Sequence, residues 1–121
     1  MYRVHSSHAN NPTLLDFYDY EPRLWLHPET AVRRGIQQGD LVKAFNELGW
    51  VRARAILDPG MHPALVKIEE GWPAESLGGQ ALNRLILPWI KPTHTLTFLP
   101  GMWEPSVAWN EVRCEVQRLE A

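Results

Sequence analysis

The sequence lacks the features that mark membrane-spanning, disulfide-bonded and metal-binding chains. Its single cysteine among 121 residues cannot form an internal disulfide, and one thiol cannot hold zinc or an iron-sulfur cluster, which need about four ligands. No apolar run approaches the about 18 residues of a membrane span, and the first residues lack the charged and apolar regions of a signal peptide. We therefore expect a soluble chain without membrane insertion. Its compartment stays open, because a targeting signal could belong to residues outside it.

The charges are too few and too scattered to predict a nucleic-acid partner. There are 12 basic and 14 acidic residues, a net charge of −2, and the basic residues form no block. Nucleic-acid-binding proteins usually concentrate Lys and Arg on one face. With 45% hydrophobic residues and six tryptophans, the chain can instead bury one core, and we expect a single domain over residues 1–121.

Motifs of common catalytic sites are also missing. His5 and His8 are three residues apart, which puts them on opposite faces of an extended segment, so we expect no metal site. No Gly-x-Ser-x-Gly turn is present to expose a nucleophile, and no glycine-rich loop is present to hold a phosphate. A hydrolase acting through Ser6 is therefore a remote alternative. Cys114 alternates with Val112 and Val116 in a predicted strand, which favours a buried structural thiol over a nucleophile.

What is present is a series of short strands separated by turns. The alternation of apolar and polar residues predicts strands at residues 2–6, 24–26, 41–46, 50–56, 64–68 and 112–119. Residues 47–49 predict a hairpin loop between the third and fourth strands. In the fourth strand, Val51, Ala53 and Ala55 share one face and Arg52 and Arg54 the other, so we expect the first face to be buried in a crowded interior. A chain this short with many strands favours a closed sheet, because open edges would be exposed to pairing with other chains.

A short helix is predicted directly after the second strand. Pro28 suits the first helical position, Glu29 lies in the first turn where the helix dipole favours a carboxylate, and Gly35 suits the left-handed end. We expect His27 to cap this helix. Residues 81–85 predict one further helical turn, which makes the chain mainly β with one or two short helices.

Several of these residues occur in an order that resembles a known family. They are Arg3-x-His5-Ser6, Asn10-Asn11-Pro12, Leu24-Trp25-Leu26-His27-Pro28-x-x-Ala31-x-x-x-Gly35-Ile36-x-x-Gly39-Asp40-Leu41-Val42 and Asn46-x-x-Gly49-x-Val51-x-Ala53. This set resembles the C-terminal dinucleotide-binding domain of the molybdopterin oxidoreductases, the dimethyl sulfoxide reductase family. The resemblance extends over residues 2–116, is strongest over 24–55 and is weakest over 89–105.

The resemblance implies a fold, a cofactor and partners. The fold would be a six-stranded double-psi β-barrel, the C-terminal part of a larger catalytic subunit. The cofactor would be a bis(molybdopterin guanine dinucleotide), with molybdenum or tungsten held by other domains. The partners would be those domains and iron-sulfur subunits, and the barrel would catalyse nothing alone. Such a cofactor carries a pyrophosphate, a guanine and a polar pterin, which suit neutral donors and backbone amides.

The resemblance also implies cofactor-binding residues. His5, Ser6 and Ser7 match the family's first loop, which lies along the pterin and phosphates. Asn83 and Asn110 match polar positions near the pterin, where an amide offers both a donor and an acceptor. Trp72 matches an aromatic position near the cofactor cleft. Outside the family context, the same Ser and Asn residues would be turn formers and Trp72 a core residue.

The chain departs from the family pattern at Thr30 and at Leu85-Ile86, which replaces the usual Leu-Thr, and two other functions stay open. The family commonly has Asp where this chain has Thr30, which can bond the helix-start backbone but carries no charge. The chain could also be a separate cofactor-binding subunit, or a protein-interaction barrel that has lost the cofactor. Neither the substrate nor the choice between molybdenum and tungsten follows from these residues.

Overall fold

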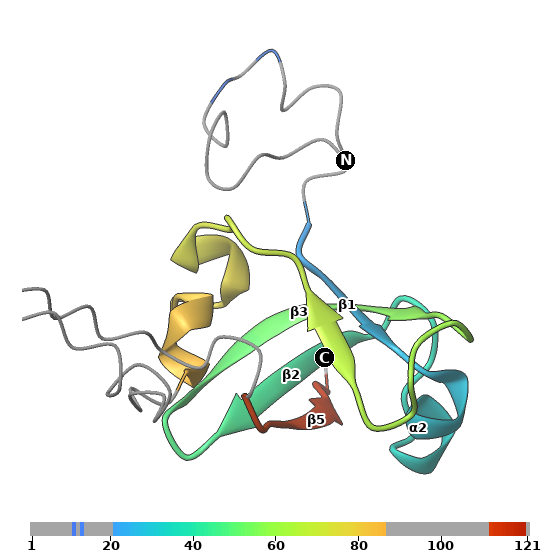
Figure 1. Ribbon diagram of the computed structural model, residues 1–121. Coiled ribbons are helices and arrows are strands. Elements are labelled where there is room, and N and C mark those ends of the chain that lie inside the picture. The colour runs from blue at the N-terminus through green and yellow to red at the C-terminus, as the bar shows by residue number, and fades with distance from the viewer. Residues whose placement is uncertain (1–10, 12, 14–20, 87–111, 121) are drawn as a thin grey trace, which may run out of the picture.

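Alternating apolar and polar residues organise the chain into one mixed β-sheet in the computed structural model, which describes residues 11, 13, 21–86 and 112–120 (Figure 1). Its strands are β1 (Arg23–Leu26), β2 (Leu41–Asn46), β3 (Gly49–Leu57), β4 (Val66–Ile68) and β5 (Glu115–Arg118). Their spatial order is β4-β1-β3-β2-β5. β1 and β3 run parallel, whereas the other neighbours are antiparallel. The described residues are therefore mainly β, as the sequence predicts.

The predicted helix is confirmed as α2 (Pro28–Arg33), directly after β1. His27 caps it, because its Nδ1 accepts a hydrogen bond from the Glu29 amide at 3.2 Å. Pro28 occupies the first helical position, where no amide donor is needed. Gly35 follows the C-cap residue with φ +63°, the left-handed conformation that ends many helices.

The hairpin between β2 and β3 has a shorter loop than the sequence predicts. Asn46 pairs with Gly49, so only Glu47 and Leu48 lie in the turn and Gly49 belongs to the strand. Gly49 is needed there for space and not for the turn. A Cβ at this position would lie 2.5 Å from Cγ of Arg84, because a later segment crosses close to the strand.

The core lies on one face of the sheet. The predicted inward face of β3 is confirmed, because Val51, Ala53 and Ala55 are each at most 2% exposed. Two 3₁₀ helices, η1 (Ala74–Leu77) and η2 (Leu82–Leu85), add Leu77 and Leu85 to this core. The other buried apolar residues are Leu24, Leu26, Ala31, Ile36, Val42, Ala44 and Val116. The helical turn predicted at residues 81–85 is thus present as η2, while η1 was not predicted.

Two predicted strands are shorter than expected, and one lies outside the described residues. Only residues 66–68 of the predicted strand 64–68 are extended, because the Leu65 amide bonds the His62 carbonyl in a turn. Only residues 115–118 of the predicted strand 112–119 form β5. The strand predicted at residues 2–6 lies outside the described part of the chain. Within that part the sheet ends at β4 and β5, so the closed six-stranded double-psi barrel is not established by this sheet.

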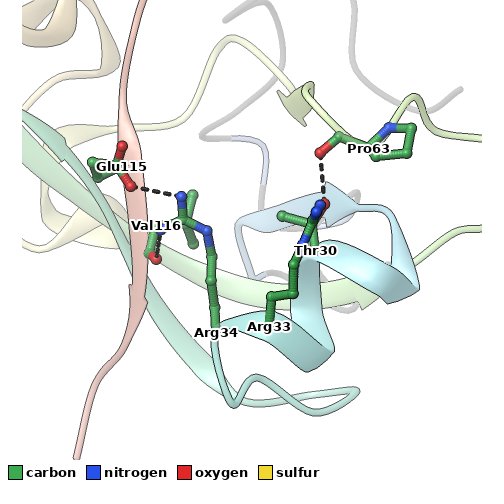
Figure 2. A network of polar contacts seen from close by, with 6 residues as sticks. All are labelled: Thr30, Arg33, Arg34, Pro63, Glu115 and Val116. Carbon is green, nitrogen blue, oxygen red and sulfur yellow. Dashed lines mark hydrogen bonds and ion pairs between the residues drawn. The ribbon is translucent and has the colours of Figure 1, made fainter.

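Arg34 covers the outer edge of β5. Its guanidinium donates to the Val116 carbonyl at 2.8 Å and forms an ion pair with Glu115 at 2.6 Å (Figure 2). The residue directly after α2 thereby bonds a backbone carbonyl of the last strand, far along the chain. Capping an edge carbonyl in this way reduces its availability for pairing with other chains.

The turn after η1 provides a test of how tightly this segment packs. Gly78 and Gly79 have nearly the same backbone angle, φ +95° and +96°, but a Cβ at Gly78 would lie 2.6 Å from the Trp50 ring, whereas one at Gly79 would meet nothing within 4 Å. We expect Gly79→Ala to cost about 1 kcal/mol from backbone strain. Gly78→Ala should cost about 1–3 kcal/mol more, because the ring must move. Urea titration of both variants measures the difference, and equal losses would contradict the contact with Trp50.

Candidate functional site

Asn46, at the end of β2, holds together two segments that are far apart in the sequence. Its Nδ2 donates to the Leu85 carbonyl at 2.8 Å and to the Arg113 carbonyl at 3.2 Å, while its Oδ1 accepts from the Leu48 amide at 3.0 Å. One side-chain nitrogen therefore fixes the end of η2 next to the residues that lead into β5. An amide can do this because it offers two donors and an acceptor.

The segment carrying η1 and η2 lies against the first half of β3. Gln80 Oε1 accepts a hydrogen bond from the Trp50 amide at 3.1 Å, and Arg84 Nε donates to the Leu48 carbonyl at 3.0 Å. These bonds, with Leu77 and Leu85 in the core, set the position of η2 on the sheet. Any residue exposed on η2 is consequently held on a rigid support.

Asn83 is such a residue. It is the second residue of η2 and is exposed, and its carbonyl accepts the Ile86 amide at 3.1 Å as the helical turn ends. Its side-chain amide can both donate and accept hydrogen bonds. The position suits a contact with a polar ligand.

Trp72 lies between β4 and η1 and has a different environment. It is half-buried and packs against the hydrophobic core. Packing is thus at least part of its role, as expected for one of six tryptophans. A cofactor contact at Trp72 stays a prediction.

The other predicted site residues, His5, Ser6, Ser7 and Asn110, lie outside the described residues. Asn110 lies three residues before Arg113 in the sequence. Asn46 donates a hydrogen bond to the Arg113 carbonyl. Of the six predicted cofactor residues, the structure therefore describes Trp72 and Asn83 alone.

Thr30 has a structural role that the sequence does not indicate. Its hydroxyl donates to the Pro63 carbonyl at 2.5 Å and accepts a hydrogen bond from Arg33 at 3.2 Å (Figure 2). The prediction that Thr30 would bond the helix-start backbone is replaced by this longer-range contact, which ties α2 to the turn before β4. The Asp that the resemblance implies here would be ionised at neutral pH and could not donate to a carbonyl.

Cys114 fits the structural role predicted for it. It is half-buried and packs against the core, as Val112 does. Burial raises the pKa of its thiol, the neighbouring Glu115 carboxylate raises the pKa further, and Arg34 acts in the opposite direction. A raised pKa keeps the thiol protonated near neutral pH, and a protonated thiol is a poor nucleophile.

The described residues show neither a metal-binding cluster nor a membrane-spanning helix. Across those residues no group of three or more His, Cys, Asp or Glu side chains is placed to hold a metal ion. None of the helices seen there has the length and apolar character to cross a membrane.

Sequence reasoning missed the residues that organise this region. Asn46 and Gln80 carry the hydrogen bonds that hold η2, yet neither was assigned a role. Asn46 occurs in the motif that resembles the family, but a polar amide at the end of a predicted strand would also suit an ordinary turn.

Known proteins share both sequence and fold with this chain. A family model described as "Molydopterin dinucleotide binding domain" matches residues 1–98. Respiratory nitrate reductase subunit alpha of Haloferax mediterranei is 30% identical over 126 aligned residues, which cover 95% of this chain and 13% of that protein. Dimethyl sulfoxide reductase DmsA of Escherichia coli K12 is 39% identical over 69 residues, covering 57% of this chain and 8% of that protein. The chain thus spans about a tenth of the length of these curated relatives.

A solved structure supports the similarity in fold. Acetylene hydratase from Pelobacter acetylenicus superposes with a TM-score of 0.53 and 21% sequence identity, covering 59% of this chain and 10% of that one. At this identity the match concerns the fold alone.

Thr30 can be tested with closely matched substitutions. Thr30→Val keeps the shape and removes the hydroxyl, so we expect a loss of about 1 kcal/mol because the Pro63 carbonyl loses its donor. Thr30→Ser, which retains a hydroxyl, should lose less. Thr30→Asp should lose at least as much as Thr30→Val. Chemical denaturation measures each variant, and a Thr30→Asp protein as stable as the original would exclude the proposed role of the hydroxyl.

The Cys114 thiol should be alkylated slowly, and its ionisation should lower the free energy of unfolding in alkaline solution. We expect alkylation by iodoacetamide at pH 8 to be slower than that of a free cysteine, because less thiolate is present. The folded state holds the thiol proton more tightly than the unfolded state. The resulting stabilisation is therefore complete below the ordinary thiol pKa and is lost as the pH rises through the folded value. Cys114→Ser should lack this alkaline loss, and alkylation at the rate of a free thiol would contradict the burial.

Proposed function

The chain belongs to the molybdopterin dinucleotide-binding domains of the dimethyl sulfoxide reductase family of molybdopterin oxidoreductases, and on that premise we propose that it binds and orients molybdopterin guanine dinucleotide. The observation that carries the proposal is the family match over residues 1–98, four-fifths of the chain. In this proposal the chain is the C-terminal domain of a larger molybdenum or tungsten enzyme and has no catalytic activity alone. The chain covers 13% and 8% of two relatives, which supports its being one part of a longer protein.

The finer fold in this proposal is a six-stranded double-psi β-barrel. Residues 2–6 would supply the strand beyond the five described, and the sheet would close on itself. The parallel pairing of β1 with β3 inside an otherwise antiparallel sheet supports a crossed topology of this kind. The contact of Arg34 with β5 also supports it, since a residue that follows β1 by one short helix reaches the far edge of the sheet.

The side-chain amide of Asn83 suits such a cofactor. Asn83 is neutral, exposed and held on η2. Its amide could pair with a pterin or guanine edge that presents a donor beside an acceptor. We assign the same kind of role to His5, Ser6, Ser7 and Asn110. Trp72 would offer a flat apolar surface, and the bound cofactor would supply the redox chemistry of its metal.

The bis form of the cofactor is the more specific proposal. It requires two pterin dinucleotides for each metal ion, of which this domain would hold part. The metal ligands, the substrate channel and the iron-sulfur partners would belong to the rest of the assembly.

Cofactor content tests the proposal directly. The native polypeptide that contains this chain should release pterin and guanine in equal amounts on denaturation, with two of each per molybdenum or tungsten. Fluorescence of the oxidised pterin and elemental analysis measure the two quantities. A native polypeptide that carries neither pterin nor metal would support a protein-interaction barrel instead.

Asn83→Ala tests the site within that function. Loss of one or two hydrogen bonds should weaken cofactor binding by about tenfold, or about 1.4 kcal/mol. Glu75→Ala, at an exposed position of η1, is the matched control and should retain the normal content. If Asn83→Ala keeps the full cofactor content, its assignment is wrong even though the family function stands.

A further inference from the structure

The face of the sheet opposite the core is rich in cations. Strand residues alternate between the two faces, and this second face carries Arg23, Lys43, Arg52, Arg54 and Lys67, interleaved with Trp25, Phe45 and Trp50. We call it the cationic face. Among the described strand residues it includes one carboxylate, Glu115, which is paired with Arg34. This concentration contrasts with the net charge of −2 of the whole chain.

Like charges meet in register on the cationic face. Lys43 is the cross-strand partner of Arg52, and Arg23 is the partner of Arg54. Such pairs destabilise a sheet unless other groups offset the repulsion. Two of these four side chains, Lys43 and Arg54, have contacts that offset the repulsion. The ammonium of Lys43 lies 5.1 Å from the Phe45 ring centroid, a distance typical of a cation–π contact.

Arg54 and Arg52 differ in their partners. Arg54 Nε bonds the Glu21 carboxylate at 2.8 Å, and its Nη1 bonds the Gly39 carbonyl at 3.2 Å. Arg52 is exposed, and no carboxylate among the described residues forms an ion pair with it. Its charge is therefore the one on β3 left without an internal counter-charge in that part of the chain.

A hollow of about 380 Å³ lies beside Arg52. Its walls include Glu21, Pro22, Arg54 and the Ser76 residue of η1. The hollow forms because the edge of β3 changes partner here. The Arg54 amide bonds the Pro22 carbonyl at 2.8 Å, but Pro22 has no amide hydrogen with which to extend the ladder.

Four residues before Arg54 along β3, the Trp50 amide bonds Gln80. Trp50, Arg52 and Arg54 are two residues apart, so their amides point to the same side of β3. The Arg52 amide therefore faces the gap between Pro22 and Gln80. Among the described residues no carbonyl accepts a hydrogen bond from the Arg52 amide, and the hollow of about 380 Å³ has room for an acidic side chain.

We propose that the cationic face docks against an acidic surface of the remaining domains of the catalytic subunit, with a carboxylate side chain seated in the hollow against Arg52. The proposal rests on the proposed function, which makes this chain one domain of a larger polypeptide. The relatives are about seven to eight times as long as this chain, since aligned segments of 126 and 69 residues cover 13% and 8% of them, so a large surface is available to meet it. Arg and Trp are the residue types enriched at the centres of interfaces, and opposite charge would relieve the repulsion between Lys43 and Arg52.

Zero-length cross-linking in the native full-length polypeptide tests the contact. Arg52→Lys keeps the positive charge and introduces a primary amine. A carbodiimide then joins that amine to a touching carboxylate as an amide, with loss of one water overall and conversion of the carbodiimide to its urea. Mass spectrometry should find position 52 linked to an Asp or Glu outside residues 1–121. Links only to carboxylates of this chain, such as Glu21, or no link at all, would overturn the proposal.

Charge reversal supplies the second measurement. In the full-length polypeptide, Arg52→Glu should speed amide hydrogen exchange in residues 49–57 by about tenfold, because the docked surface opens. Arg33→Glu is the matched control, since Arg33 is exposed on α2, which packs on the core side, and exchange in residues 49–57 should stay normal. If amide hydrogen exchange in residues 49–57 is unchanged in Arg52→Glu, the proposed interface is wrong.

Cofactor content measured on the same samples separates this proposal from the proposed function. Cross-links to another domain in a polypeptide without pterin would leave the interface standing and refute cofactor binding. Full pterin content without such cross-links would support cofactor binding and refute the interface. If Arg52→Glu fails to fold, the cross-linking of Arg52→Lys still decides the question.

Discussion

The described fold depends on β3 and on the use of both of its edges. Along one edge it pairs with β2 over its first six residues, and along the other it pairs with β1 over its last four. Its inward residues, Val51, Ala53 and Ala55, form the floor of the core. The small alanines allow the covering segments to approach closely, and a tightly packed interior tolerates little change in volume. The positions of η1 and η2 follow from this strand.

The first half of β3 has no β1 residue beside it, and side chains take over that role. Gln80 bonds the Trp50 amide, as a strand neighbour otherwise would. Gly49 and Gly78 leave the space that lets the η1–η2 segment pass close to the strand. This arrangement satisfies the Trp50 amide of an inner strand and holds Asn83 on the surface. It also leaves the hollow beside Arg52, so one irregular edge accounts for both the candidate cofactor contact and the proposed interface.

Side-chain hydrogen bonds join segments that are far apart in the sequence. Asn46 bonds the residues on either side of the undescribed segment 87–111, and Arg34 bonds the edge of β5. Thr30 joins α2 to the turn at Pro63. Each contact uses a side chain whose partner is more than 30 residues away, which is why local sequence patterns could not indicate it. The family resemblance located Asn83, but nothing in the sequence showed that Asn46 and Gln80 would hold it in place.

The sequence alone determined the elements that depend on neighbouring residues. The period-two alternation of 50–56 identified the buried face of β3, and Pro28 and Gly35 placed the ends of α2, since both signals act within a few residues. The ordered motifs also identified the family. Tertiary structure alone decided that Gly49 lies in a strand, that Thr30 bonds Pro63, and that Arg52 lies beside Lys43 with no carboxylate of the described residues paired to it. Those outcomes depend on which strands become neighbours and in what register, and the register is set by the packing of the whole core and not by any single segment.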